Sequence, residues 1–226
     1  MNPESISTGY AVHIGFGGHG MSGVTEGPDG KIYWQIGDIG ANITAKDGKQ
    51  YKNPNRWAKH LAPWFNEACK EAKDKGYQFI AYPADIADMA DCDRFIQLLI
   101  ANHGGVDFLI NNAGRSIRRA IEGSYDRFHD FERTMQLNYF GCLRVTMGLL
   151  PGMVGKRKGH VVNISSIGVL TNAPRFSAYV ASKAALDAWT RCASSEFADQ
   201  GITFTTINMP LVRTPMIAPT QIYKNV

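Results

Sequence analysis

The sequence lacks the features that mark a membrane protein, a disulfide-bonded secreted protein or a metalloenzyme. No stretch of its 226 residues approaches the ~18 consecutive apolar residues of a membrane-spanning helix. No basic segment followed by an apolar run occurs at the start, so we expect no secretory signal. The four cysteines form no C-x-x-C pair, and we expect them to be reduced in the cytoplasm. The six histidines have no metal-ligand spacing, so we expect no metal.

Strong charge of one sign is also missing. The net charge of +4 is not concentrated in a stripe, so nucleic acid is not an expected partner. Apolar residues make up 44% and charged residues 19% of the chain, which is typical of a soluble globular protein. The length suits one sizeable α/β domain.

From about residue 56 the chain alternates between helix-like and strand-like segments. Helical periodicity covers residues 56–75, 87–102, 128–150 and 177–198, and short apolar runs cover 77–83, 106–111, 160–165 and 202–208. Continuous apolar strands are typical of a parallel sheet that is covered on both faces. The alternation therefore predicts an α/β fold with a doubly wound, Rossmann-like parallel sheet.

Residues 1–55 differ in texture, since they are rich in glycine and have little helical periodicity. Turn signals at 28–30 and 45–51 predict antiparallel hairpins. The string GPDGKIY is loosely similar to a blade of the quinoprotein-type β-propeller dehydrogenases. A single blade cannot bury its faces alone, so this segment stays a β-like region of uncertain role.

A glycine pattern in this first segment imitates a dinucleotide-binding motif. Gly15, Gly17 and Gly20 follow a short apolar run, and Asp38 stands where a ribose-binding acid is expected. The motif works only when a helix follows, because the helix N-terminus faces the pyrophosphate. Residues 21–30 contain three more glycines and a proline, which disfavour a helix. We therefore expect a loop between strands here.

Several polar motifs stand in order in the second part of the chain. They are Asn111-Asn112-Ala113-Gly114 after an apolar strand, Asn138 in a helix, Ser166 at a strand end, Tyr179-x-x-x-Lys183, and PLVRTP at 210–215. Singly, each has an ordinary structural reading as a cap, a turn or a helix surface residue. Together, in this order, they resemble the short-chain dehydrogenase/reductase family, so the expected function is carbonyl oxidoreduction.

The spacing of Tyr179 and Lys183 has a chemical reason. Residues four apart share one face of a helix, and an ammonium beside a phenol is expected to lower the phenol pKa toward neutrality. The resemblance implies that Tyr179 transfers the proton, that Ser166 polarises the carbonyl, and that Lys183 also holds the nicotinamide ribose. It further implies that Asn138 positions a water that links Lys183 to solvent.

The same resemblance implies a nicotinamide cofactor, which we expect to be NADPH, with NADH as the alternative. The residues matched to cofactor contacts are Asp85, Asn111, Ala113, Gly114, Tyr179, Lys183, Pro210, Val212 and Thr214. Asp85 has a second reading, as the N-cap of the helix that begins near residue 88.

Longer strings narrow the resemblance. NNAGRSIRR, YDRFHDFERTMQLNYFG and INMPLVRTPMIAPT, within residues 57–226, are similar to the bacterial fatty acyl-CoA reductases. A long-chain fatty acyl-CoA or fatty aldehyde is the substrate that this implies. Arg115, Arg118 and Arg119 then meet coenzyme A phosphates, or else form a solvated loop.

The sequence departs from the family in its first part. The family's first βαβ unit, with its cofactor loop, has no clear counterpart, and we expect a catalytic region over 56–226 that is truncated at its C-terminal end. Two hypotheses follow: a carbonyl or acyl-CoA reductase, or a non-catalytic fragment or fusion that cannot bind cofactor. In the family, the helices matched by 128–150 and 177–198 form the dimer interface, so a homodimer or tetramer is expected.

Overall fold

Three parallel strands in the second half of the chain form one sheet of the computed structural model. The structure describes residues 21–26, 31–36, 42–44, 50–52, 70, 74–76, 78–82 and 84–211. The strands β6 (Phe108–Asn111), β7 (Gly159–Ser166) and β8 (Ile202–Met209) pair in the order β6-β7-β8. Both pairings are parallel, with Asn111 opposite Asn163 and Ser166 opposite Met209. The predicted parallel α/β arrangement is therefore confirmed for this half of the chain.

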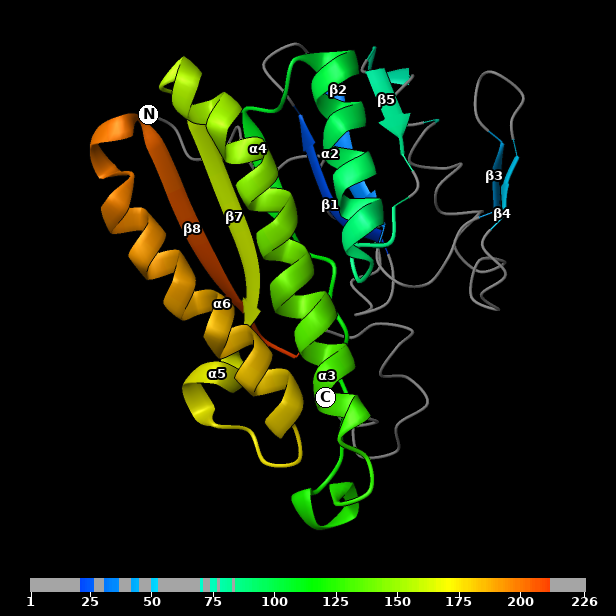
Figure 1. The fold of residues 1–226 in the computed structure, drawn as a ribbon, viewed down its shortest axis with the longest axis vertical. Helices are drawn as coiled ribbons and strands as arrows, with labels where there is room; N and C mark the ends of the chain where they lie inside the picture. The colour runs from blue at the N-terminus through cyan, green and yellow to red at the C-terminus, as the bar shows by residue number, and fades with distance from the viewer. Residues whose placement is uncertain are drawn as a thin grey trace.

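Helices cover one face of these strands. The helical elements are α2 (Met89–His103), η2 (Ile121–Ser124), α3 (His129–Met135), α4 (Cys142–Lys156), α5 (Ile167–Thr171), α6 (Ser177–Glu196) and η4 (Ala198–Gln200). Figure 1 shows α2, α4 and α6 on the same side of the strands, as right-handed crossovers require. The helix predicted over 56–75, which a doubly wound sheet needs on its other face, lies almost entirely outside the described residues.

The first part of the chain contributes hairpins. The strands β1 (Met21–Glu26) and β2 (Lys31–Ile36) are antiparallel, and so are β3 (Asn42–Thr44) and β4 (Gln50–Lys52). These are the two hairpins that the turn signals predict. The strand β2 also pairs in parallel with β5 (Gln78–Ala81), so the second three-stranded sheet has the order β1-β2-β5.

This second sheet stands beside the first. The strand β1 contacts β6, and Figure 1 shows β1 and β2 behind α2, between β5 and the β7–β8 pair. The spatial succession is therefore β5-β2-β1-β6-β7-β8. The sequence left a gap of two strands between β5 and β6, and the β1–β2 hairpin occupies that gap, with β1 running antiparallel to β2.

One predicted helix has an interruption that the periodicity did not indicate. The segment expected as one helix over 128–150 consists of α3, the π-helical segment η3 (Gln136–Gly141) and α4. Gly141 ends the π-helical segment, and a Cβ there would lie 2.1 Å from the carbonyl oxygen of Ile86. The change from α-helical to π-helical winding coincides with the close packing of η3 against Ile86 and with the buried hydrogen bonds of Asn138. A π-helical segment within an α-helix often marks a functional site.

The core lies between the helices and the parallel strands. Its fully buried members include Ile96 and Leu99 of α2, Val145 and Leu149 of α4, and Val161 of β7. The helix α2 packs on α4, and α4 and α6 pack on β7. This packing fixes the carboxyl ends of β6 and β7 relative to the first turns of α6, where the candidate site lies.

Candidate active site

Ser166 and Tyr179 meet at the carboxyl end of β7. Ser166 is the last residue of β7 and the N-cap of α5, and its Oγ accepts a hydrogen bond from the Gly168 amide at 3.1 Å. Tyr179 lies in the first turn of α6, close enough to the Ser166 side chain for that hydroxyl to lower the pKa of the phenol. The hydroxyl groups of the two predicted catalytic residues are therefore adjacent.

Lys183 lies one turn further along α6 and is 3% exposed. Its Nζ donates a hydrogen bond to the carbonyl oxygen of Ile164 at 2.7 Å. A Cβ built on Gly114 would lie 3.4 Å from this Nζ and 3.3 Å from Asn138 Oδ1. The glycine thus allows the backbone after β6 to approach both side chains, and Gly114, Asn138 and Lys183 form one cluster.

Asn138 holds the loop after β6 against the catalytic helix. Its Oδ1 accepts from the Arg115 amide at 2.7 Å, and its Nδ2 donates to the Arg115 carbonyl at 2.8 Å. The same Nδ2 donates to Ser182 Oγ at 2.9 Å, and that hydroxyl donates to the Tyr179 carbonyl at 2.7 Å. Ser182 is therefore part of the site. The sequence analysis missed it because its only signal is its place directly before Lys183.

The pKa of Tyr179 shifts in the direction opposite to the one that the sequence predicted. Burial raises the pKa of Tyr179, the hydrogen bond with Ser166 opposes this change, and the charge of Asp187 raises the pKa further. Burial lowers the pKa of Lys183, while the charges of Cys142 and Asp187 act in the opposite direction. The expectation that Lys183 lowers the pKa of Tyr179 is wrong for this structure, because burial disfavours the charged form of both groups.

Asn111 and Ala113 are buried in the protein interior. Asn111 donates from Nδ2 to Thr146 Oγ1 at 2.9 Å and to Asn163 Oδ1 at 2.8 Å, and Asn163 donates to Thr190 Oγ1 at 2.8 Å. These bonds join the ends of β6 and β7 to α4 and α6. The Asn111 side chain therefore holds together the elements that carry the site. Direct contacts of Asn111 and Ala113 with a cofactor stay predictions.

The other residues predicted to bind cofactor are either exposed at the surface or outside the residues that the structure describes. Asp85 is exposed and accepts from the Ala87 amide at 2.9 Å, but the N-cap of α2 is Asp88, so the N-cap reading of Asp85 is wrong. Pro210 follows β8 and is exposed. Val212 and Thr214 lie outside the described residues, as do Gly15, Gly17, Gly20 and Asp38.

The cluster at the ends of β6 and β7 fits the nicotinamide end of a cofactor. Gly114 leaves its backbone close to the buried amino group of Lys183, Tyr179 lies one turn before Lys183 on α6, and Ser166 approaches Tyr179 from the end of β7. Glycine at such a position permits the close approach of a ligand. A nicotinamide cofactor held there would supply the hydride, and hydroxyl groups beside it have the chemistry to donate hydrogen bonds and a proton.

Two further observations concern the described residues alone. Within the ranges given above, no helix is both long and apolar enough to cross a membrane. The same ranges contain no group of three or more His, Cys, Asp or Glu residues that could hold a metal ion.

The parallel strands, their helical crossovers and the cluster of polar side chains at the ends of β6 and β7 define a Rossmann-like α/β protein. The family model described as short chain dehydrogenase matches residues 58–224. The chain therefore belongs to the short-chain dehydrogenase/reductase family, which is an enzyme family that uses NAD(P).

Known proteins similar to this chain agree with the family. A fatty acyl-CoA reductase of Acinetobacter baylyi is 61% identical over 154 residues, which are 68% of this chain and 52% of that protein. A short-chain dehydrogenase of Streptomyces avermitilis is 34% identical, with a TM-score of 0.60 over 66% of this chain and 54% of the other. NAD⁺-bound xylitol dehydrogenase is 26% identical, also with a TM-score of 0.60, over 66% of this chain and 57% of the other. The chain spans about half the length of the curated relatives that it matches.

Proposed function

We propose that the protein is an NADPH-dependent reductase of a long-chain fatty acyl-CoA or fatty aldehyde. In this proposal Tyr179 donates the proton to the carbonyl oxygen and Ser166 polarises the same oxygen by a hydrogen bond. Lys183 holds the cofactor ribose. The observation that carries the proposal is the cluster of Ser166, Tyr179 and Lys183 at the carboxyl end of β7.

The geometry supports this division of roles. The proximity of Ser166 and Tyr179 places two hydroxyl groups where a single carbonyl oxygen can accept from both. A phenol with a raised pKa is protonated at neutral pH, so Tyr179 begins the reduction as the acid. After the transfer Tyr179 must be reprotonated, and we assign Asn138 and Ser182 to the proton path because Asn138 donates to Ser182 Oγ and that hydroxyl donates to the backbone carbonyl of Tyr179.

The substrate class rests on the similarity to the fatty acyl-CoA reductase of Acinetobacter baylyi. The match to the family model over residues 58–224 supports the reaction type, because this range contains the proposed catalytic residues of β7 and α6. The preference for NADPH over NADH rests on the resemblance to the fatty acyl-CoA reductases, because the family's first βαβ unit, which normally makes this choice, has no clear counterpart in this chain.

One observation favours a second candidate, a chain that keeps these residues but binds no cofactor. In the family, the first βαβ unit provides parallel strands and the cofactor loop. Here the corresponding places are taken by a hairpin whose strand β1 is antiparallel to β2. A protein of this kind would present the catalytic cluster without the diphosphate site that positions a nicotinamide.

Cofactor binding separates the two candidates. We would titrate the purified protein with NADPH and NADH, following tryptophan fluorescence, and then follow NADPH oxidation with fatty acyl-CoA and fatty aldehydes. The reductase should bind NADPH saturably, and Tyr179→Phe should abolish turnover without loss of binding. Tyr82→Phe is the matched control, because Tyr82 contacts His103 at the end of α2. Absence of binding of either cofactor to well-folded protein would establish the second candidate.

A further inference from the structure

A buried carboxylate gathers several cationic side chains at the start of α3. Asp130 is 3% exposed, yet it lies in a surface-facing element. Its carboxylate accepts from Arg127 Nε at 3.0 Å and from the Arg133 guanidinium, and Arg119 Nε stands 3.5 Å away. Burial alone would raise the pKa of Asp130, but the hydrogen bonds from Arg127 and Arg133 outweigh it and lower the pKa. The residue is therefore a carboxylate at neutral pH.

The positive charge of the arginines around Asp130 exceeds the negative charge of its single carboxylate. One carboxylate stands among three guanidinium groups, whose side chains are 39%, 36% and 51% exposed for Arg119, Arg127 and Arg133. Each guanidinium has five N–H donors in a planar fork, and the bonds to Asp130 use only part of them. The remaining donors of three fixed guanidinium groups form a preorganised site for a small anion with several oxygens.

The cluster is connected to the catalytic cluster through the backbone. Asn138 lies eight residues after Asp130 on the same continuous helical run, a rise of roughly 12 Å. Asn138 holds the Arg115 backbone, and the Arg119 amide donates to the Arg175 carbonyl at 2.7 Å, just before α6. The segment from Arg115 to Arg119 thus runs from the catalytic residues to the arginine cluster.

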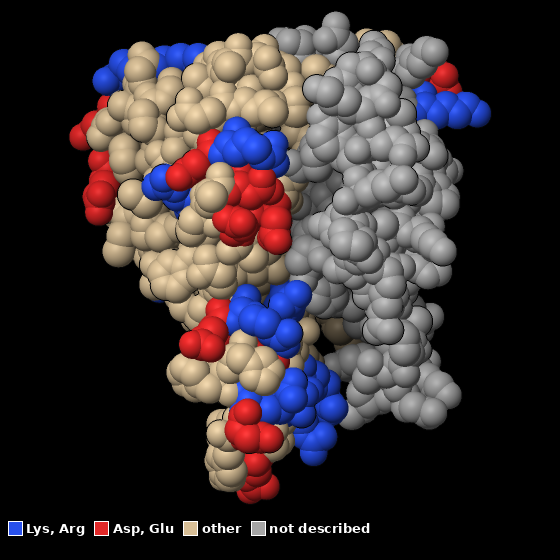
Figure 2. All heavy atoms as spheres, turned by 45° about the vertical axis from the view of Figure 1, so that its right-hand side comes forward, with Lys and Arg blue, Asp and Glu red and all other residues tan. Residues whose placement is uncertain are grey.

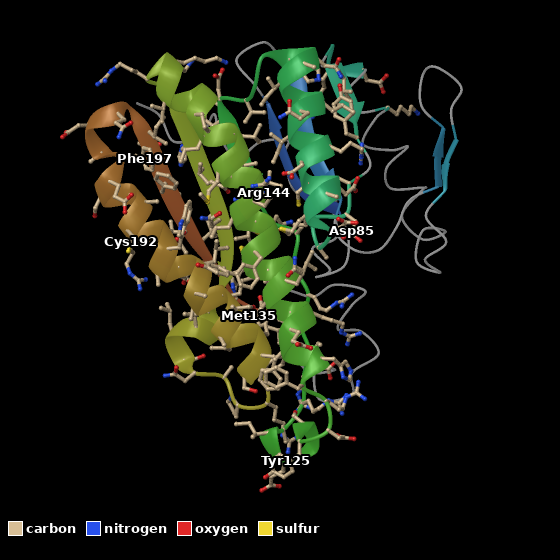
Figure 3. The ribbon with its side chains drawn as sticks, viewed as in Figure 1. Asp85, Tyr125, Met135, Arg144, Cys192 and Phe197 are labelled. Carbon is tan, nitrogen blue, oxygen red and sulfur yellow. The ribbon has the colours of Figure 1, made fainter. Side chains whose placement is uncertain are left out.

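The figures place this region at one end of the molecule. Figure 3 shows Tyr125 at the lower tip and Met135 above it, with α3 leading from one to the other. Figure 2 shows basic side chains gathered over this lower end of the molecule, with acidic side chains beside them.

An exposed aromatic ring adjoins the arginines. Phe128 is 70% exposed, and its ring stacks on Phe131 with centroids 6.0 Å apart and planes at 22°. It stands in the chain between Arg127 and His129, and the latter is also close to Asp130, at 3.3 Å. A nucleotide is recognised by this combination of groups. Its base stacks on an aromatic ring, and its phosphates accept charge-assisted hydrogen bonds from several guanidinium groups beside the ring.

The local charge balance restricts the size of the ligand. Residues 115–133 contain five arginines and four acidic residues, a net charge of +1. A long polyanion would meet the exposed Glu122, Asp126 and Glu132 as well as the arginines. A compact phosphomonoester or diphosphate needs only the three guanidinium groups around Asp130.

We propose that Arg119, Arg127 and Arg133, held together by Asp130, bind the 3′-phospho-adenosine diphosphate end of the acyl-CoA substrate, with its adenine on Phe128. This inference rests on the proposed function, because it assigns the nucleotide end of the same substrate. The pantetheine arm then runs along residues 115–119 toward Ser166 and Tyr179. Arg127 and Arg133 contact phosphate directly, whereas Asp130 is a positioning residue that fixes them.

The test uses a fragment of coenzyme A on the full chain. Adenosine 3′,5′-bisphosphate is titrated calorimetrically into the wild type, Arg127→Gln, Arg133→Gln and the double variant, with adenosine 2′,5′-bisphosphate in parallel. We expect each single substitution to weaken binding of the 3′,5′-isomer by about 5- to 20-fold and the double substitution to abolish it. The 2′,5′-isomer should bind these arginines at least tenfold more weakly.

A matched arginine controls for the loss of surface charge. Arg144 is 51% exposed, like Arg133, and forms a bidentate pair with Asp93 of α2. Arg144→Gln should bind adenosine 3′,5′-bisphosphate as the wild type does. If acyl-CoA turnover is measurable, Arg133→Gln should raise KM for the acyl-CoA and leave KM for the corresponding free aldehyde unchanged.

Three outcomes would overturn the inference. They are no binding of the 3′,5′-isomer to folded protein, binding that both arginine substitutions leave intact, and equal arginine-dependent binding of the two isomers. A parallel NADPH titration of the same variants separates this result from the proposed function. NADPH binding without arginine-dependent 3′,5′-isomer binding would refute only the nucleotide site, and the reverse result would refute only the reductase.

Discussion

The Nζ of Lys183 donates a hydrogen bond to the carbonyl oxygen of Ile164 at 2.7 Å, two residues before Ser166 on the same strand. This bond joins α6, which contains the proposed catalytic residues Tyr179 and Lys183, to the end of β7. It therefore fixes the position of Tyr179, which lies one turn earlier on α6, relative to Ser166 at the end of β7. The ammonium is thereby held in the protein interior at the point where the proposed cofactor ribose would lie.

Burial of Lys183 predicts a specific dependence of stability on pH. Its pKa in the folded protein is below its ordinary value, so the unfolded chain holds the proton more tightly. The free energy of unfolding therefore rises with pH between the folded-state pKa and about 10.5. We expect the wild type to gain stability relative to Lys183→Met as the pH rises from 7 toward 10. Urea unfolding midpoints of both proteins across that range measure the difference, and a constant difference would contradict the prediction.

Tyr179 should show the opposite dependence. Its pKa in the folded protein is above the ordinary value of about 10, so the folded state retains the phenolic proton when the unfolded chain has lost it. Stability that Tyr179 contributes is complete below pH 10 and is lost as the pH rises through the folded-state pKa. The wild type should therefore lose stability faster than Tyr179→Phe above pH 10, as measured by urea unfolding. Equal loss in both proteins would show that burial does not shift this phenol.

Asn138 should contribute to stability as well as to catalysis. Its replacement by alanine removes three hydrogen bonds and leaves the amide and carbonyl of Arg115 without these partners. Unsatisfied buried groups cost about 1–3 kcal/mol each, so we expect a loss of roughly 3 kcal/mol in the free energy of unfolding. Asn102→Ala is the matched control, because Asn102 is exposed and makes one long bond to Tyr82. Its effect should stay below about 0.5 kcal/mol.

Local signals predicted much of the second part of the chain. The strands β7 and β8 and the helix α6 begin and end within two residues of the predicted bounds, because apolar runs and helical periodicity depend on neighbouring residues alone. The adjacency of Tyr179 and Lys183 follows from the helical repeat for the same reason.

Contacts between distant segments were not predictable in this way. The bond between Asn138 and Arg115 joins residues 23 positions apart, and no period in the sequence encodes it. Likewise the placement of the β1–β2 hairpin beside β6 depends on which strand edges the rest of the sheet leaves open. The arginines around Asp130 follow a spacing of three only in part, since Arg119 reaches the cluster from a different element.

Two glycines of the same helical run should respond to alanine in opposite directions. At Gly141 a Cβ would lie 2.1 Å from the Ile86 carbonyl oxygen, and backbone atoms cannot move aside as a flexible side chain can. Gly141→Ala should therefore destabilise the protein by about 3 kcal/mol or more. At Gly152, in α4, a Cβ would meet no atom within 4 Å. Gly152→Ala should stabilise the protein by about 0.5–1 kcal/mol, because alanine loses less backbone entropy in a helix.

The pair tests whether the π-helical segment is held by contact with Ile86. Chemical denaturation of both variants gives the two free energies, and NADPH titration reports on the site. If Gly141 were merely a helix residue, both substitutions would stabilise the protein to a similar extent. A loss of stability confined to Gly141→Ala, together with weaker NADPH binding, would show that the packing of η3 on Ile86 positions Asn138 for the cofactor site.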